Sequence, residues 1–185
     1  ADKTARLDEG PWAGYTLHDL YARGSMPWEW IPAIFDRAKY HGMVGFATPF
    51  DETAVDFLQS IDCPVYKLAS IEITDIPLIQ HIAKTGKPII ISTGMATQKE
   101  IWQAIDAARG CEEVTLLKCT SAYPASAEDL NLATMNDMQT WLTAVGLSDH
   151  TQGSLAAVLA IALYGATVIE KHLTLSRADG GTDSS

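Results

Sequence analysis

The stretch VGLSDH-TQGSLAAVLAIALYGA-TVIEKHL, residues 145–173, decides how this chain folds. Two short apolar pieces with β-branched residues flank an Ala- and Leu-rich run that ends at Gly165 and is long enough for about three to four helical turns. This pattern predicts a strand, a helix and a second strand, and such a crossover makes the two strands parallel neighbours. Each strand ends in a polar cluster that contains a histidine, His150 or His172.

We therefore expect both histidines at the carboxyl ends of adjacent parallel strands, where α/β barrels place their chemistry. Two imidazoles flanked by hydroxyl, carboxylate and ammonium groups indicate a divalent-metal site. In the alternative, each histidine only caps the end of its strand through a hydrogen bond. The residues alone leave both interpretations open.

Composition excludes several classes of protein. With 185 residues and 47% hydrophobic side chains, the chain is long and apolar enough for one domain with a real core. A net charge of -10 argues against a nucleic-acid partner and against an anionic membrane surface. Three cysteines without a CxxC pair fit a reducing compartment, so we expect a cytoplasmic protein. No apolar run reaches the length of a membrane span, and no membrane partner is expected.

The first 43 residues differ from the rest in composition. Residues 1–26 are mixed and polar with several glycines, and only residues 16–21 are expected to form one or two helical turns. The sequence PWEW, residues 27–30, places proline where a helix commonly starts, and the helix is expected to end at Gly42. We interpret residues 1–43 as an insertion and a helix that precede a barrel strand. The two tryptophans form either a ligand platform or a packing contact.

From residue 44 onward, strand-like and helical segments alternate at intervals of roughly 20–30 residues, which predicts a parallel α/β fold. Several strands are apolar on both faces, as expected of buried parallel strands. Such a series forms either an open doubly wound sheet or most of a (β/α)8 barrel. The expected strands are residues 44–48, 65–69, 88–93, 114–119, 144–148 and 167–171, and the expected helices are residues 51–61, 75–85, 97–109, 127–140 and 152–164.

The strand ends favour the barrel. An open sheet needs functional groups only at its switch point, whereas a barrel gathers all its strand ends around one mouth. Every expected strand here ends in hydroxyls, a charge or an imidazole. These donors suit a phosphate or a carboxylate, with a lysine supplying the positive charge. They are Thr48, Lys67, Ser70, Ser92, Thr93, Ser121 and Ser148.

Two of the charged residues keep more than one interpretation. Lys67 is an anion ligand, a Schiff-base lysine or a solvated strand-end residue. Glu72 is a general acid or base, or only a turn residue. The single glycine in STGMAT is a weak indication of a phosphate-binding turn. Neither a P-loop nor a GxGxxG sequence is present, so nucleotide binding is not expected.

Six motifs together resemble the sialic acid synthase family, which condenses phosphoenolpyruvate with an aldose to make nine-carbon ulosonic acids. They occur in the family's order and spacing and span about two thirds of the chain. Within the family, DLY followed by PWEW, then EITDIPLI and GGTDSS, are most similar to the pseudaminic acid synthases. The six motifs are TPFD (48–51), YKLASIE (66–72), ISTGMAT (91–97), CTSAYP (119–124), GLSDHT (146–151) and VIEKHLTL (168–175).

The resemblance implies a role for each matching residue. His150 and His172 match the metal-binding histidines, with Mn²⁺ or Mg²⁺ as the ion. Lys67 and Glu72 are the candidate catalytic residues, Lys67 to hold the anion and Glu72 to transfer a proton. Tyr123 and Glu72 match positions at the sugar end of the site. The positions that hold phosphoenolpyruvate are matched by Thr48, Lys67, Ser70, Ser92, Ser121 and Ser148. The family usually has asparagine where this chain has Ser121, so that contact departs from the family pattern.

The resemblance also predicts that this chain is a fragment. Nothing before residue 44 resembles the first two barrel strands, and the last barrel helix and the C-terminal antifreeze-like domain are not matched. We therefore expect residues 44–185 to form a partial TIM barrel of strands three to eight, cut from a homodimeric parent. Two alternatives stay open: a non-catalytic fragment that binds weakly, and a Schiff-base aldolase barrel that uses Lys67. A metal-dependent hydrolase would need further metal ligands, and none is found in the sequence.

Overall fold

The computed structural model describes residues 5–8, 13–141 and 144–179. The chain divides into two compact units, residues 1–44 and residues 45–185. Within the described ranges, no helix has the length and apolar character needed to cross a membrane.

The first unit contains the two helices that the sequence predicts. Helix α1, Leu17–Gly24, begins where the Thr16 hydroxyl accepts a hydrogen bond from the amide of Asp19 at 3.1 Å. A short 3₁₀ turn η1, Trp28–Trp30, leads directly into α2, Ile31–Tyr40, which has a proline in its first turn. No side chain of η1 or α2 is buried, so the two tryptophans are not core residues.

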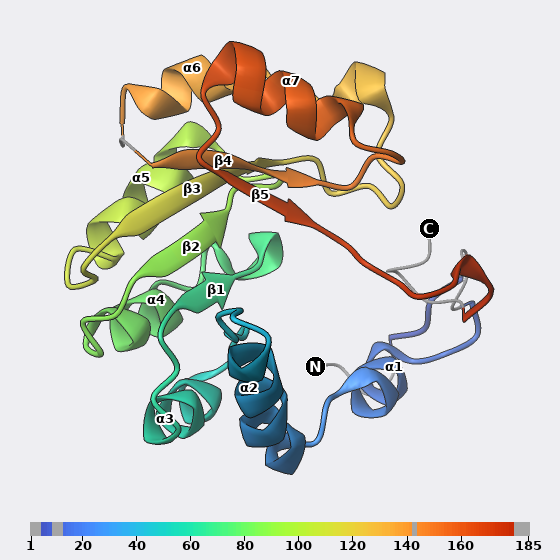
Figure 1. Cartoon of the computed structure of the whole chain (residues 1–185), viewed down its shortest axis with the longest axis vertical. Helices are drawn as coiled ribbons and strands as arrows, with labels where there is room; N and C mark the ends of the chain where they lie inside the picture. Colours follow the sequence, from blue (N-terminus) through green and yellow to red (C-terminus); the bar gives the residue numbers. More distant parts are fainter. Residues whose placement is uncertain (1–4, 9–12, 142–143, 180–185) are drawn as a thin grey trace. The chain divides into compact units, whose positions relative to one another are not determined.

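The second unit is a five-stranded parallel sheet with the strand order β1-β2-β3-β4-β5. Consecutive strands are neighbours, and the helices between them pack along one side of the sheet, as Figure 1 shows. This arrangement is a half-barrel, which agrees with the predicted α/β fold and its partial (β/α)8 architecture. The strands are β1 (Tyr66–Leu68), β2 (Ile89–Ser92), β3 (Val114–Cys119), β4 (Val145–Asp149) and β5 (Val168–Lys171).

Local sequence explains where the helices of this unit begin and end. The carboxylate of Asp51 accepts the amide of Ala54 at 2.8 Å to start α3, and Thr97 and Glu100 form a reciprocal capping box at the start of α5. Gly165 ends α7 in the left-handed conformation with φ of 63°. The elements are α3 (Glu52–Ser60), η2 (Ser70–Glu72), α4 (Ile76–Ala83), α5 (Gln98–Ala107), η3 (Ala127–Asp129), α6 (Thr134–Gln139), α7 (Leu155–Tyr164) and η4 (Arg177–Asp179).

Strands β4 and β5 are parallel neighbours, as the 145–173 pattern predicts. Gly146 lies opposite Val168 in this pair, and a Cβ atom at position 146 would overlap the carbonyl oxygen of Val168. Glycine is therefore required by the close approach of the two strands. The same register places Ser148 opposite Glu170.

The predicted strand at residues 44–48 is wrong in extent. Only an isolated parallel bridge between Ala47 and Tyr66 forms there, supported by the amide of Lys67 donating to the carbonyl of Ala47 at 3.1 Å. Pro49 follows and has no N–H group for a longer ladder. From residue 44 onward, the described residues thus form five strands where the sequence predicts six.

The predicted helix at residues 127–140 is also interrupted. It splits into η3 and α6, with Asn131 between them at a positive φ of 44°. Asparagine tolerates this left-handed conformation better than most residues, which allows the chain to turn there. Helix α7 starts at Leu155, three residues later than predicted, after Gly153 at φ of 80°.

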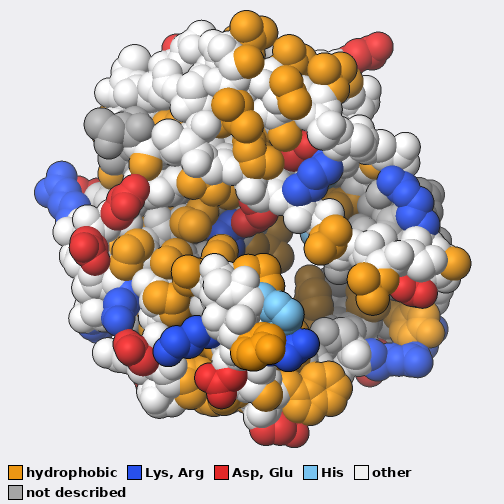
Figure 2. All heavy atoms as spheres, in the orientation of Figure 1, with side chains coloured by type: hydrophobic (Ala, Val, Ile, Leu, Met, Phe, Trp, Pro, Cys, Tyr) orange, Lys and Arg blue, Asp and Glu red, His pale blue; other side chains and the backbone are white. Residues whose placement is uncertain are grey.

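The hydrophobic core of this unit lies between the sheet and its helices. Burial of each large side chain contributes about 1.5–3 kcal/mol. Helix α7 contributes little to this core, because it buries only the small residues Ala156 and Ala160, while larger residues such as Val158 and Leu163 stay exposed. Figure 2 shows hydrophobic side chains on the surface over the region of α7. The fully buried side chains include Leu68, Leu78, Ile79, Ile82, Ile89, Ile91, Leu116, Leu117, Met135, Met138 and Leu147.

Candidate functional site

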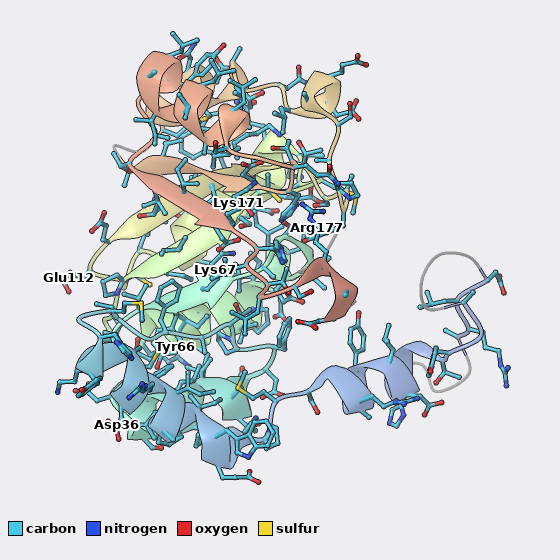
Figure 3. All side chains as sticks on the ribbon, turned by 45° about the vertical axis from the view of Figure 1, so that its right-hand side comes forward. Asp36, Tyr66, Lys67, Glu112, Lys171 and Arg177 are labelled. Atoms are coloured by element: carbon cyan, nitrogen blue, oxygen red, sulfur yellow. The ribbon has the colours of Figure 1, made fainter. Side chains whose placement is uncertain are left out.

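Lys67 is the buried cation of the inner face of the sheet. It projects from β1 (Figure 3) and is only 6% exposed. Its ammonium group donates to the carbonyl of Leu68 at 2.7 Å and to the hydroxyl of Ser92, on the next strand, at 2.8 Å. Burial lowers the pKa of Lys67, and the nearby carboxylate of Glu170 partly opposes this effect.

Four further residues meet where β1, β2 and β3 end: Ser70, Gly94, Cys119 and Ser121. The hydroxyl of Ser70 donates to the sulfur of Cys119 at 3.3 Å. Gly94 has a positive φ of 46°, and a Cβ atom at this position would overlap the side chain of Ser70 and lie 3.0 Å from the hydroxyl oxygen of Ser121. The STG turn therefore brings its backbone against two serine hydroxyls, an approach that only glycine permits. Such a ring of donors is suited to an anion.

The two predicted metal-binding histidines lie together, with ring centroids 5.2 Å apart. Nδ1 of His150 lies 2.8 Å from the carbonyl oxygen of Thr120 and so carries the proton in the neutral ring. The lone pair of Nε2 is then available, with the hydroxyl of Ser148 at 3.4 Å. Burial lowers the pKa of His150, which favours the neutral imidazole that a metal requires.

A small cavity opens beside the histidines. The ring of Tyr123 stacks on His150 with centroids 4.1 Å apart and meets His172 edge-on at 5.3 Å. The cavity has a volume of about 310 Å³, and Lys171 and Arg177 also line it. It therefore combines aromatic surface, imidazole nitrogens and cationic side chains, which suits a polar ligand of small size.

His150 and His172 are the candidate metal ligands, and the described part of the chain adds no third His, Cys, Asp or Glu ligand to them. Across residues 5–8, 13–141 and 144–179, no group of three or more His, Cys, Asp or Glu side chains is arranged to hold a metal ion. The hydrogen bond from Nδ1 of His150 to a backbone carbonyl is the usual support of a metal-binding imidazole. Two imidazoles therefore fit an ion whose remaining ligands are water or substrate oxygens.

Glu72 lies in η2, immediately after the strand that carries Lys67. Its Oε2 atom is buried and has no hydrogen-bond partner among the described residues. Burial raises the pKa of Glu72 to about 7, against the opposing effects of its backbone hydrogen bond and of Lys67. A carboxyl group with this pKa exchanges a proton near neutral pH, as a general acid or base must.

Thr48 is not connected to these networks by a hydrogen bond within the described part of the chain. It follows the Ala47 bridge, beside β1. The structure thus brings together most of the predicted donors: Lys67 with Ser92, Ser70 with Ser121, and Ser148 with His150 and Tyr123.

Glu170 is the site residue to which the sequence assigns no role of its own. Its Oε1 accepts the hydroxyl of Ser148 at 2.9 Å, and its Oε2 lies 3.5 Å from the ammonium nitrogen of Lys67. The alternation of side chains along a strand could have found it, because Glu170 shares a strand face with His172. The residue between them, Lys171, instead pairs with the buried Asp149 at 2.8 Å.

Comparison with known proteins gives consistent results. The chain matches the model of the NeuB family over residues 1–185. It is 43% identical to a pseudaminic acid synthase from Helicobacter pylori over 94% of this chain and 52% of that protein. It is 42% identical to an N,N'-diacetyllegionaminic acid synthase from Legionella pneumophila over 77% of this chain and 42% of that protein.

A solved structure shows the same fold. The crystal structure of N-acetylneuraminic acid synthetase from Leptospira borgpetersenii, in complex with citrate, superposes with a TM-score of 0.84 at 31% identity. The match covers 90% of this chain and 59% of that one. The chain thus spans about half the length of the curated relatives it matches. By its match to the family model from end to end, this chain belongs to the NeuB family.

Proposed function

We propose that this chain is the anion- and metal-binding half-barrel of a synthase that condenses phosphoenolpyruvate with an N-acetylated amino-sugar aldose. The product would be a nonulosonic acid, with release of phosphate. One observation carries the proposal: the hydroxyl-supported ammonium of Lys67 and the imidazole pair lie at the ends of strands of one curved sheet. The named synthases that the chain resembles support the same reaction class.

The first part of the proposed site would bind phosphoenolpyruvate. Its phosphate and carboxylate need several donors and at least one fixed positive charge. Lys67 supplies the charge, and Ser92 already orients its ammonium group. Ser70 and Ser121, against the Gly94 backbone, supply hydroxyls at the ends of the neighbouring strands. This contribution is mainly one of positioning, since it holds the enol carbon toward the histidines.

The second part would bind the sugar aldehyde. A divalent ion, Mn²⁺ or Mg²⁺, held by His150 and His172 would polarise the aldehyde oxygen as a Lewis acid. His150 presents Nε2 because its Nδ1 proton is engaged by the carbonyl of Thr120. Tyr123 covers one face of the His150 ring and gives the sugar an aromatic surface.

The atoms of the proposed reaction balance without a further reactant apart from water. The C3 carbon of phosphoenolpyruvate bonds to the aldehyde carbon, which leaves positive charge at C2. Water adds at C2, and phosphate then leaves by cleavage of the C2–O bond. Glu72 has the pKa, about 7, to take the proton of the incoming water or to give one to the sugar oxygen.

The length of the chain limits what these residues achieve alone. Five strands leave β1 and β5 as the two edges of an open sheet, and the relatives are about twice as long. We therefore assign turnover to the full-length product of the gene and expect the 185-residue chain to bind without efficient turnover. We propose the pseudaminic acid precursor as the sugar, on the similarity of the residues 72–79 and 27–30 to pseudaminic acid synthases.

The test is phosphate release from phosphoenolpyruvate, measured for the full-length gene product and for this chain. Each protein is incubated with the 6-deoxy-diacetamido-altrose or with N-acetylmannosamine, in Mn²⁺ and in EDTA. Metal-dependent release with the altrose sugar alone supports the pseudaminic assignment, and release with mannosamine moves the sugar within the family. No release by the full-length protein with either sugar refutes the synthase.

A matched pair of lysine variants locates the anion site. Lys67→Met removes the buried cation, whereas Lys87→Met removes a lysine whose partner is the exposed Asp62, at 2.8 Å. Only the first should abolish phosphoenolpyruvate binding. Borohydride trapping of a keto acid on Lys67, together with activity that resists EDTA, would instead establish the Schiff-base aldolase.

A further inference from the structure

The ammonium group of Lys67 has three N–H donors, and two of them already have partners. These are the carbonyl oxygen of Leu68 and the hydroxyl oxygen of Ser92, at 2.7 and 2.8 Å. The third donor faces Oε2 of Glu170 at 3.5 Å, a distance longer than either hydrogen bond. An arriving anion that uses Lys67 must therefore share or take this third donor.

Glu170 is held in place from the other side of the open sheet. Lys67 is on β1 and Glu170 on β5, the two edge strands, so the ion pair crosses the inner face from one edge to the other. The hydroxyl of Ser148 on β4 donates to Oε1 of Glu170 at 2.9 Å. This bond leaves Oε2 as the atom that meets Lys67, and 37% of the Glu170 side chain remains exposed.

Other ionisable groups near Lys67 do not duplicate this role. Glu72 in η2 acts on the lysine only through charge, without a direct contact, whereas Glu170 acts through charge and through a direct contact. Lys67 is almost completely buried, and a buried ammonium without a counter-charge is costly. The ammonium group of Lys67 therefore needs a neighbouring anion before any ligand arrives.

We propose that the carboxylate of Glu170 is an internal anion, which holds the third donor of Lys67 until the anionic group of a ligand displaces it. This inference rests on the proposed anion site, and it adds a positioning residue to that site. Ser148 keeps the carboxylate close, so it returns to Lys67 when the ligand leaves. Glu170 thereby opposes tight retention of phosphoenolpyruvate and of the phosphate that the reaction releases.

The proposal has a consequence of definite sign. Replacing Glu170 by Gln keeps an oxygen for the Ser148 hydroxyl but removes the competing charge. The anion then gains Lys67 without breaking an ion pair and without lying beside a carboxylate. Because the pair is partly exposed, we expect a tightening of about three- to tenfold. A variant that is only misfolded would bind more weakly, so a gain in affinity is not a consequence of damage.

The experiment is calorimetric titration of the 185-residue chain with phosphoenolpyruvate and, separately, with inorganic phosphate, in EDTA so that no metal contributes. Wild type is compared with Glu170→Gln and with Asp62→Asn. The control removes one carboxylate charge from the exposed Lys87 pair and so makes the same change in net charge. Tighter binding by Glu170→Gln, with Asp62→Asn unchanged, supports the internal anion.

The opposing outcomes are separable. If wild type binds and Glu170→Gln binds equally or more weakly, Glu170 is not a competitor and the inference is overturned. An equal gain in Asp62→Asn also overturns it, because net charge alone then accounts for the effect. If neither the wild type nor the full-length gene product binds phosphoenolpyruvate, the proposed function itself fails, and the internal anion fails with it.

Discussion

Replacing Glu72 by Gln should change the pH dependence of stability in a way that identifies the buried carboxyl group. Burial raises the pKa of Glu72 from its ordinary value of 4.5 to about 7 in the folded chain. The folded state therefore binds a proton that the unfolded state releases between these two values. The stabilising contribution of the protonated Glu72 is complete below about pH 4.5 and is lost as the pH rises through about 7. Above that pH the carboxyl group must ionise in the folded chain, where its buried Oε2 has no hydrogen-bond partner among the described residues.

The size of the effect follows from the two pKa values. Each factor of ten in a dissociation constant corresponds to about 1.4 kcal/mol, which sets an upper limit of about 3.4 kcal/mol for Glu72. Oε2 is buried, but the residue as a whole is only partly buried, so solvent screening reduces this limit. We expect about 1–2 kcal/mol between pH 5 and pH 8, which is roughly 3–6 °C in Tm for a domain of this size.

The assay is differential scanning calorimetry of wild type and Glu72→Gln at both pH values. The variant cannot ionise, so its Tm should exceed that of the wild type by a larger margin at pH 8 than at pH 5. Glu112→Gln, at an exposed position, is the matched control and should show no such dependence. A Glu72→Gln difference that is the same at both pH values would refute the raised pKa and, with it, the proton-transfer role.

Three further predictions follow from the site and its supports. Gly94→Ala should weaken phosphoenolpyruvate binding at least ~10-fold in calorimetric titration, because the added Cβ would overlap the side chain of Ser70. The control is Gly42→Ala, at a glycine that also has a positive φ, 72°, but has open space around it. This control should lower the free energy of unfolding by only about 1–2 kcal/mol and leave binding intact. Thr97→Ala removes one half of a capping box and should lower the free energy of unfolding by about 1 kcal/mol, measured by urea denaturation. His172→Ala should abolish the visible absorption that Co²⁺ gains on binding two imidazoles, measured in the absence of any substrate.

The structure shows which kinds of feature the sequence predicts well. The β4–α7–β5 unit and the meeting of His150 with His172 follow from a local hydrophobic pattern and from the handedness of crossovers. The pairing of Lys67 with Ser92 follows from the barrel topology, because adjacent parallel strands bring their carboxyl ends together. Each of these requires only that neighbouring strands pair.

Features that depend on several elements at once were not predictable in the same way. The predicted strand at residues 44–48 forms only one bridge. A strand needs a neighbouring strand and a continuous ladder of hydrogen bonds, and the apolar pattern of these residues alone does not show whether either is present. Asn131 interrupts a helical pattern through a backbone conformation that an amphipathic period does not encode. The unpartnered Oε2 of Glu72 depends on which atoms surround η2, and no spacing in the sequence reports that.

The Lys67–Glu170 pair shows why curvature matters more than sequence distance at this site. The two residues lie on the first and last strands of the sheet, and in a flat sheet they would be separated by three intervening strands. At about 4.8 Å per strand, that separation approaches 20 Å. A distance of 3.5 Å is possible only because the sheet curls and its inward side chains reach across the concave face. The ion pair is therefore direct evidence that the sheet is curved as in a half-barrel. Any change that flattens the sheet must leave the buried ammonium of Lys67 without its counter-charge, so the curvature of the fold and the charge state of the anion site are maintained together.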